Sequence, residues 1–209
     1  MSELELEKTV QEQISELVAK GRNAMKEIAD YDQEQVNTLV QAAAWAIYKQ
    51  EHAETLAALS IKDTGLGKYE DKVSKNQRKT FGTLRDLLAP EAKSVGVINV
   101  DEEKGLIEIA KPVGVVGAIC PSTNPGATPA NKVMMALKGR NAVILAPSPK
   151  GASTCVKYLE YLYEELKKVG GPLDLVQMIP TPVSKEKTGE LMKQVDFIAL
   201  TGSAKNIQI

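Results

Sequence analysis

Three short segments of the chain combine hydroxyl, amide, proline and glycine residues directly after runs of apolar residues. They are CPSTNP at 120–125, APSPKG at 146–151 and TGS at 201–203. Each segment leads towards the start of a helix, where free backbone N–H groups can hold an anion such as a phosphate. The pattern favours a ligand of the nucleotide type. Turn chemistry alone is the alternative, because it also produces loops rich in serine, glycine and proline.

Few side chains are available for covalent or metal chemistry. The chain has two cysteines, Cys120 and Cys155, and a single histidine, His52. One histidine excludes a histidine-rich metal site and any triad that needs a second histidine, so we predict no metal site and expect His52 to be a surface or packing residue. Cys120 ends an apolar run. Cys155 lies near the start of an amphipathic helix, whose dipole can lower a thiol pKa.

The spacing of apolar residues predicts that the first half of the chain is helical. Residues 3–89 show helical steps such as Val10, Ile14 and Leu17, and Asp32 is suited to be the N-cap of a second helix. Two further helices are expected before residue 90, with glycines between them. These helices are expected to pack against the second half of the chain, which carries the three polar segments.

In the second half of the chain, the spacing of apolar residues changes from the helical pattern to that of strands alternating with helices. Short alternating strands at 94–100 and 106–111, with Gly105 between them, predict a hairpin. Beyond Pro112, apolar strands alternate with amphipathic helices, which predicts a parallel sheet covered by helices on both faces. The strands of that sheet are expected at 113–119, 141–146, 175–179 and 195–200. Ligands on such sheets bind at the carboxyl ends of the strands, where the three polar segments lie.

The composition excludes several classes of protein. The 209 residues are 43% hydrophobic and 25% charged, with a formal net charge of −1. A nearly neutral chain with 4% aromatic residues gives no reason to expect nucleic acid or an anionic membrane as a partner. No apolar run approaches a membrane span, and the acidic N-terminus lacks the features of a signal peptide. We therefore expect a cytoplasmic protein.

Successive motifs resemble those of the aldehyde dehydrogenase superfamily. KPVGVVGAICPSTNP at 111–125, NAVILAPSP at 141–149 and VDFIALTGS at 195–203 occur in the family's order. DTGLGKYEDKVSKN at 63–76, and PSTNP in place of the usual Pro-Trp-Asn, resemble the coenzyme A-acylating branch. That branch includes the aldehyde domain of bifunctional aldehyde-alcohol dehydrogenases. The resemblance covers nearly the whole chain and implies an aldehyde dehydrogenase-like α/β fold with a Rossmann-like parallel sheet.

The resemblance also implies a reaction, in which a small aldehyde and coenzyme A (CoA) are converted to acyl-CoA with NAD or NADP. A cysteine thiolate attacks the aldehyde, hydride passes to the nicotinamide, and CoA takes the acyl group from the resulting thioester. The family's catalytic cysteine lies well downstream of TGS, so Cys120 and Cys155 are expected to be packing residues. Acetaldehyde, succinate semialdehyde and sulfoacetaldehyde all fit the branch.

Asn124 matches the family asparagine whose side-chain amide stabilises the oxyanion. An amide N–H suits this task because it donates without adding a charge or a proton to track. The local alternative is an Asx-turn that caps the next helix, because the asparagine sits beside Pro125. Gly202 and Ser203 match residues near the cofactor pyrophosphate, with a plain N-cap beside a turn glycine as their alternative.

The family pattern extends the predicted cofactor site to two further strand ends. The predicted contacts are Pro121, Ser122, Thr123, Pro147, Ser148, Gly202 and Ser203. Hydrolytic family members carry a ribose-binding carboxylate where this chain has Pro149, which Lys150 follows. Without the carboxylate there is less of a barrier to a 2′-phosphate, and Lys150 can attract one. Both NAD and NADP are therefore predicted, with CoA as co-substrate.

The resemblance divides the chain into three parts. Residues 1–92 form a helical region that packs on the cofactor domain, 93–111 a hairpin arm for oligomerisation, and 112–209 the first part of the NAD(P)-binding domain. The family's catalytic domain is expected beyond this sequence, so we expect the 209-residue chain alone to be inactive. The hairpin arm implies a homo-oligomer, because a partner subunit would cover its free edge. The acidic first helix is expected to pack on the domain rather than to target a partner.

Two other functions stay open from the sequence. An ordinary aldehyde dehydrogenase would release a carboxylate instead of an acyl-CoA. A noncatalytic nucleotide-binding or oligomerisation module would bind a cofactor or self-associate without turnover.

Overall fold

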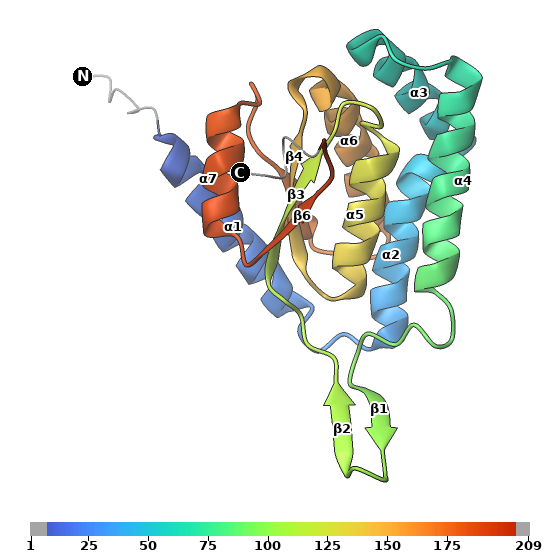
Figure 1. Ribbon diagram of the computed structural model, residues 1–209, viewed down its shortest axis with the longest axis vertical. Helices are drawn as coiled ribbons and strands as arrows, with labels where there is room; N and C mark the ends of the chain where they lie inside the picture. Colours follow the sequence, from blue (N-terminus) through green and yellow to red (C-terminus); the bar gives the residue numbers. More distant parts are fainter. Residues whose placement is uncertain (1–7, 204–209) are drawn as a thin grey trace.

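A computed structural model describes residues 8–203 of the chain. Its body is a parallel sheet flanked by helices, and a two-stranded hairpin projects from one end of it (Figure 1). The acidic stretch 1–7 and the segment 204–209 after TGS lie outside the described residues. The mixed α/β fold predicted from the sequence is confirmed.

Helices make up the first part of the described chain and alternate with strands in the second. The helices are α1 (Val10–Glu27), α2 (Gln33–Tyr48), α3 (Gln50–Thr64), α4 (Tyr69–Leu87), α5 (Ala127–Lys138), α6 (Ala152–Lys168) and α7 (Lys185–Gln194). The first two begin with capping boxes. Thr9 pairs with Glu12, and Asp32 pairs with Gln35, so the predicted N-cap at Asp32 is confirmed.

The strands form two separate sheets. The hairpin pairs β1 (Val97–Asp101) with β2 (Leu106–Ile109) in antiparallel fashion. The parallel sheet contains β3 (Val115–Cys120), β4 (Ala142–Pro147), β5 (Val176–Met178) and β6 (Phe197–Leu200). Its strand order is β5-β4-β3-β6, so the chain runs outward from β3 to β5 and then returns to the other side of β3.

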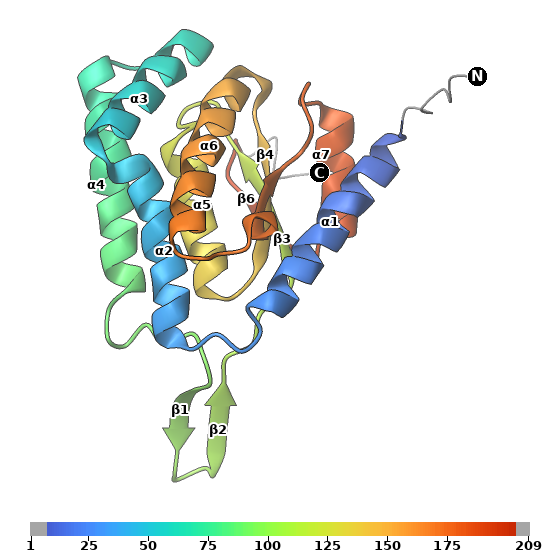
Figure 2. The same cartoon turned by 180° about the vertical axis from the view of Figure 1, so that it is seen from behind.

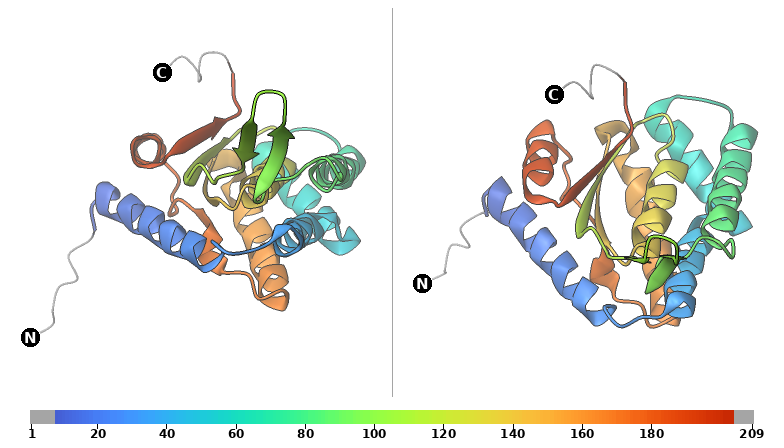
Figure 3. Two further views of the ribbon diagram at one scale, coloured as in Figure 1. Left: turned by 90° about the horizontal axis from the view of Figure 1, so that it is seen from below. Right: turned by 60° about the horizontal axis from the view of Figure 1, so that its bottom comes forward.

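Helices cover both faces of the parallel sheet, as the sequence predicted. Figure 3 shows α1 and α7 together on one side, while α5 and α6 lie on the other. A second layer follows on the α5 and α6 side, where α2 packs on both of these helices and α3 and α4 lie outside them (Figure 2). Helices from the first part of the chain thus share one core with the sheet. Within the described residues, no helix is long and apolar enough to cross a membrane.

His52 is a packing residue of this outer layer. It is buried in α3, its ring stacks on Tyr161 of α6 at 3.6 Å between centroids, and its Nδ1 lies 3.0 Å from the carbonyl oxygen of Ala46. Burial lowers the pKa of the imidazole. The histidine therefore packs α3 against α6 and is not one of the residues that follow the strand ends.

Gly114 sets how β3 enters the sheet. Its φ is +120°, and a Cβ atom added there would lie 2.2 Å from an Asp196 carboxylate oxygen. That carboxylate accepts a 2.7 Å hydrogen bond from the Val115 N–H and forms an ion pair with Arg22 of α1 at 2.9 Å. Glycine is therefore required both by the backbone angle and by the close approach of the loop before β6.

Replacing Gly114 with alanine is expected to lower the free energy of unfolding by about 2 kcal/mol or more, because strain and a clash act together. Gly170→Ala is the matched control, since Gly170 also has a positive φ, +70°, but has open space around its Cα. Urea unfolding of the full-length protein measures the loss in free energy of unfolding for both variants. Equal losses in the two variants would contradict the role given to Asp196.

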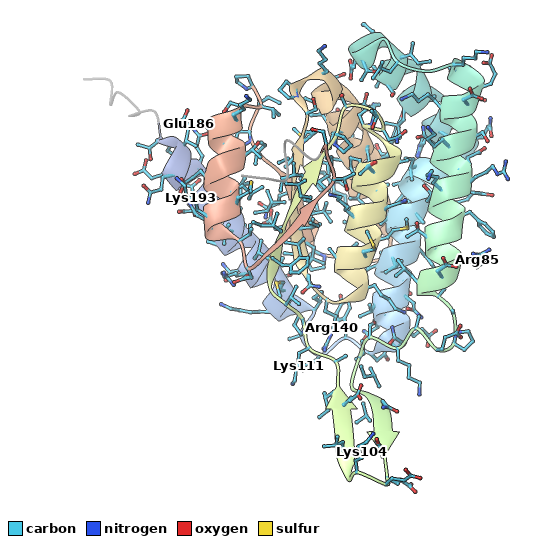
Figure 4. All side chains as sticks on the ribbon, in the orientation of Figure 1. Arg85, Lys104, Lys111, Arg140, Glu186 and Lys193 are labelled. Atoms are coloured by element: carbon cyan, nitrogen blue, oxygen red, sulfur yellow. The ribbon has the colours of Figure 1, made fainter. Side chains whose placement is uncertain are left out.

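The hairpin extends away from the body and is apolar for its size. Val100 and Ile107 face each other across its two strands and are 55% and 63% exposed. Lys104 at the tip, labelled in Figure 4, pairs with Asp101 at 2.8 Å. The position of the hairpin leaves its strand edges and apolar side chains uncovered in the described chain, a state that a two-stranded sheet in water does not favour.

Candidate functional site

The order of the parallel strands predicts a crevice at their carboxyl ends. The connection from β3 runs to β4 on one side, whereas β6 lies on the other side of β3. Neighbouring strands whose connections diverge leave a crevice between their carboxyl ends, which is where open α/β sheets bind ligands. In this chain that switch point lies between β3 and β6.

Hydrogen bonds join all three polar segments at this end of the sheet. The Thr201 N–H donates to the Ile119 carbonyl at 3.1 Å, which joins TGS to the end of β3. The Ser148 N–H donates to the Cys120 carbonyl at 3.0 Å, which joins the end of β4 to the same strand. The segments predicted to share a site are therefore adjacent, although up to 80 residues separate them in sequence.

A close approach of two loops completes the end of the sheet. A Cβ atom added to Gly151 would lie 2.5 Å from Cβ of Pro125. Gly151 precedes α6, and Pro125 precedes α5. Only a glycine allows the loop after β4 to lie this close to the loop that carries Asn124.

Asn124 has a side-chain amide that the described residues leave without a partner. Its Oδ1 is buried and accepts no hydrogen bond. The N-cap of α5 is Gly126, and no side chain caps that helix, so the predicted alternative of a capping Asx-turn is not formed. The amide is held at the carboxyl end of β3 and is unoccupied by local structure. An unpaired acceptor of this kind suits a hydrogen-bond donor of a ligand, and the N–H groups of the same amide are the atoms that can donate to a developing negative charge.

The other predicted contacts differ in exposure. Pro121, Ser122 and Ser148 are half-buried, whereas Thr123, Gly202 and Ser203 are exposed. Pro147 is buried at the end of β4, where it pairs with Cys120. The prediction that each of these residues contacts a cofactor stays a prediction.

One part of the anion prediction is wrong, because a carboxylate already occupies the start of α6. Asp63, at the end of α3, accepts hydrogen bonds from the Ser153 hydroxyl at 2.7 Å, the Thr154 hydroxyl at 2.8 Å and the Thr154 N–H at 3.1 Å. A phosphate at this helix start would lose these donors and be repelled by the carboxylate. By contrast, no side chain caps the start of α5 within the described residues, and this helix follows directly from the end of β3.

The two cysteines are packing residues, as predicted. Cys120 is 3% exposed, and burial raises the pKa of its thiol to about 12. Cys155 is fully buried in α6, and burial likewise raises its thiol pKa. Because a nucleophilic cysteine must be a thiolate near neutral pH, neither residue is suited to attack a substrate.

Two buried lysines near the crevice were missed by the sequence reasoning. Lys132 of α5 donates to the carbonyls of Ile119 at 2.7 Å and Ala199 at 2.5 Å, so it joins β3 to β6 at the switch point. Lys72 of α4 donates to the carbonyl of Thr123 at 2.6 Å. The available signal was weak: each lysine falls on the buried side of a helix, where a charged residue is unusual.

Burial lowers the pKa of both lysines, and within residues 8–203 neither ammonium forms an ion pair. Two positive charges therefore lie beside the loop after β3 without a carboxylate partner in the described chain.

Two surface clefts lie away from the carboxyl ends of the strands. One lies between α1 and α7 near Glu186 and Lys193, which Figure 4 labels, and the other lies between α2 and α4.

The fold defines a class: an α/β protein with a parallel sheet whose switch point lies between β3 and β6, and with Asn124 in the loop after β3. A family model described as the aldehyde dehydrogenase family matches residues 4–208. The chain belongs to the aldehyde dehydrogenase family.

The similarity of the chain to individual proteins agrees with this family assignment. A sulfoacetaldehyde dehydrogenase (acylating) of Cupriavidus necator is 52% identical over 95% of this chain and 40% of its own length. A succinate-semialdehyde dehydrogenase (acetylating) of Clostridium kluyveri is 38% identical over 93% of this chain and 42% of its own. The crystal structure of an acetylating aldehyde dehydrogenase from Geobacillus thermoglucosidasius superposes with a TM-score of 0.84 at 32% identity, covering 97% of this chain and 45% of that one. The chain thus spans about two-fifths of the length of these curated relatives.

Proposed function

We propose that the protein is a CoA-acylating aldehyde dehydrogenase that oxidises a small aldehyde to an acyl-CoA with NAD or NADP. The observation that carries the proposal is the amide of Asn124, unpaired at the switch point of a sheet of this family. The acylating class is supported by a relative named as acylating at 52% identity and by one named as acetylating at 38% identity. Among small aldehydes we propose sulfoacetaldehyde, the aldehyde named in the relative at 52% identity.

Asn124 would act on the charge that develops at the aldehyde oxygen. When a thiolate adds to the carbonyl carbon, the oxygen gains negative charge, and a fixed amide N–H lowers the energy of that state. The amide is already held in the fold, so little reorganisation opposes the step. We propose that the thiolate comes from a cysteine beyond this chain, because Cys120 and Cys155 remain thiols.

The crevice fits a nicotinamide cofactor in its main features. The uncapped start of α5 and the buried ammonium group of Lys132 suit an anionic group, and we propose that Ser122, Thr123, Gly202 and Ser203 line its place. When bound, the nicotinamide supplies a hydride acceptor. The chain's own residues would position and enclose it.

The choice between NAD and NADP depends on two opposing charges near the loop after β4. Lys150 is exposed and would attract a 2′-phosphate. Asp63 places a carboxylate at the first turn of α6 and would repel one. An assay of the protein must therefore include both cofactors.

The proposed activity is tested with the full-length protein, sulfoacetaldehyde and each cofactor, by following reduced nicotinamide with and without CoA. We expect sustained turnover only when CoA is present. Equal rates without CoA would instead support a dehydrogenase that releases a carboxylate. Cofactor binding without any turnover would support a noncatalytic nucleotide-binding module. The second outcome contradicts the acylating class, and the third contradicts enzyme activity.

A further inference from the structure

Lys72 reaches the loop that carries Asn124 from a different part of the chain. It lies in the first turns of α4, its side chain is 6% exposed, and its ammonium donates to the carbonyl of Thr123 at 2.6 Å. Thr123 immediately precedes Asn124, and 51 residues separate the lysine from its acceptor. A peptide carbonyl held on one side limits how far the next residue can turn.

We infer that Lys72 is the positioning residue for Asn124: its ammonium fixes the Thr123 carbonyl and so fixes the amide that stabilises the oxyanion. This inference rests on the proposed function and deepens it. Lys72 makes no contact with substrate in this account. It acts through the backbone of the loop.

A second residue of α4 lies beside the other end of the same loop. Asn76, one turn after Lys72, is buried and donates to the Ala53 carbonyl at 3.0 Å. A Cβ atom added to Gly126 would lie 3.4 Å from Oδ1 of Asn76, so the loop lies directly against this side chain. Asn124 therefore lies between one residue that α4 holds by a hydrogen bond and another that lies close to the same helix, and a helix is a better support than a loop alone.

The stem of Lys72 is itself confined by the turn before α4. Gly67 has a φ of +86°, and a Cβ atom added there would lie 3.0 Å from Cε of Lys72. The absence of a side chain at Gly67 lets the turn close over the methylene groups. A lysine enclosed in this way loses the freedom that usually makes it a poor support.

A purely structural role would not need a charge at this position. Burying an ammonium costs free energy that an apolar side chain of similar volume avoids, and within the described residues no carboxylate offsets this cost. The charge gives a strong hydrogen bond to one carbonyl. The rival explanation is an anionic ligand, since two of the three N–H groups of the ammonium have no protein acceptor in the described chain.

The test is a double-mutant cycle in the full-length protein with Lys72→Met and Asn124→Ala. Methionine fills the space of lysine but cannot hold the carbonyl. We expect Lys72→Met to lower kcat about ten- to a hundredfold while the KM values for CoA and the nicotinamide cofactor stay unchanged. In the Asn124→Ala background, the same change is expected to cause no further loss of kcat. Lys79→Met, on the exposed side of α4, is the matched control and should keep full activity.

Each other outcome overturns the inference in a recognisable way. Losses that multiply in the double variant would mean that Lys72 does not act through Asn124. A raised KM for CoA or cofactor with unchanged kcat would identify an anion-binding lysine. Full activity of Asn124→Ala would overturn the oxyanion assignment itself, and the role of Lys72 with it. If Lys72→Met does not fold, Lys72→Gln replaces it, with a shorter side chain and no charge, and any loss of kcat that it causes is expected to be absent in the Asn124→Ala background.

Discussion

Replacing Asn124 with alanine is expected to lower kcat of the full-length protein by about a hundredfold or more, the usual effect of removing one oxyanion donor. The amide makes no hydrogen bond within the described chain, so its loss breaks no structural contact there. The change should therefore leave the melting temperature and the binding of NAD or NADP nearly unaffected. Steady-state kinetics, thermal unfolding and cofactor titration measure the three quantities on one preparation.

Asn131 provides the matched control for this experiment. It lies in α5, and its Oδ1 is also buried without a partner, but it is four residues into the helix and so lies outside the loop after β3. Asn131→Ala is expected to keep most of kcat. A similar loss in both variants would show that removing any buried amide near α5 disturbs the fold, and it would contradict the specific role of Asn124.

Charged residues on the hairpin are expected to convert an oligomer into monomers. Val100 and Ile107 are paired neighbours on one face of the arm, and both are more than half exposed in the chain alone. An apolar two-stranded sheet with free edges is unstable in water, so we propose that a second copy of the protein covers it. Lys at both positions would then bury like charges in the interface and disrupt it.

Sedimentation velocity of the variant Val100→Lys with Ile107→Lys measures this effect. The control changes Asn99 and Glu108 to Ser, because that cross-strand pair points to the opposite face of the arm. We expect a monomer from the first variant and an oligomer from the control. A monomeric wild-type protein would contradict the proposal, because it would mean that other parts of the same polypeptide cover the hairpin.

The sequence predicted the elements well because their signals are local. Apolar residues repeat every two positions in the hairpin, every three or four in α1, and in unbroken runs in β3 and β4, and each period belongs to one kind of element. Parallel strands also bring their carboxyl ends to one edge. That is why the segments after β3, β4 and β6 could be predicted to meet before any contact between them was known.

Contacts between distant residues could not be predicted in this way. The hydrogen bond from Lys72 to Thr123 and the cap that Asp63 places on α6 both depend on how α3 and α4 pack against the sheet. No period in the sequence fixes that packing. The cap also reversed one inference: an uncapped helix start after β4 was expected to hold an anion, and a carboxylate from α3 occupies it instead.

The acylating reaction is tested by identifying the product that the full-length protein makes from sulfoacetaldehyde. Mass spectrometry of a quenched reaction with CoA and the preferred cofactor distinguishes a CoA thioester from a free carboxylate. The account predicts one equivalent of sulfoacetyl-CoA for each equivalent of reduced nicotinamide. Reduced nicotinamide accompanied by free sulfoacetate and unconsumed CoA would contradict the acylating reaction.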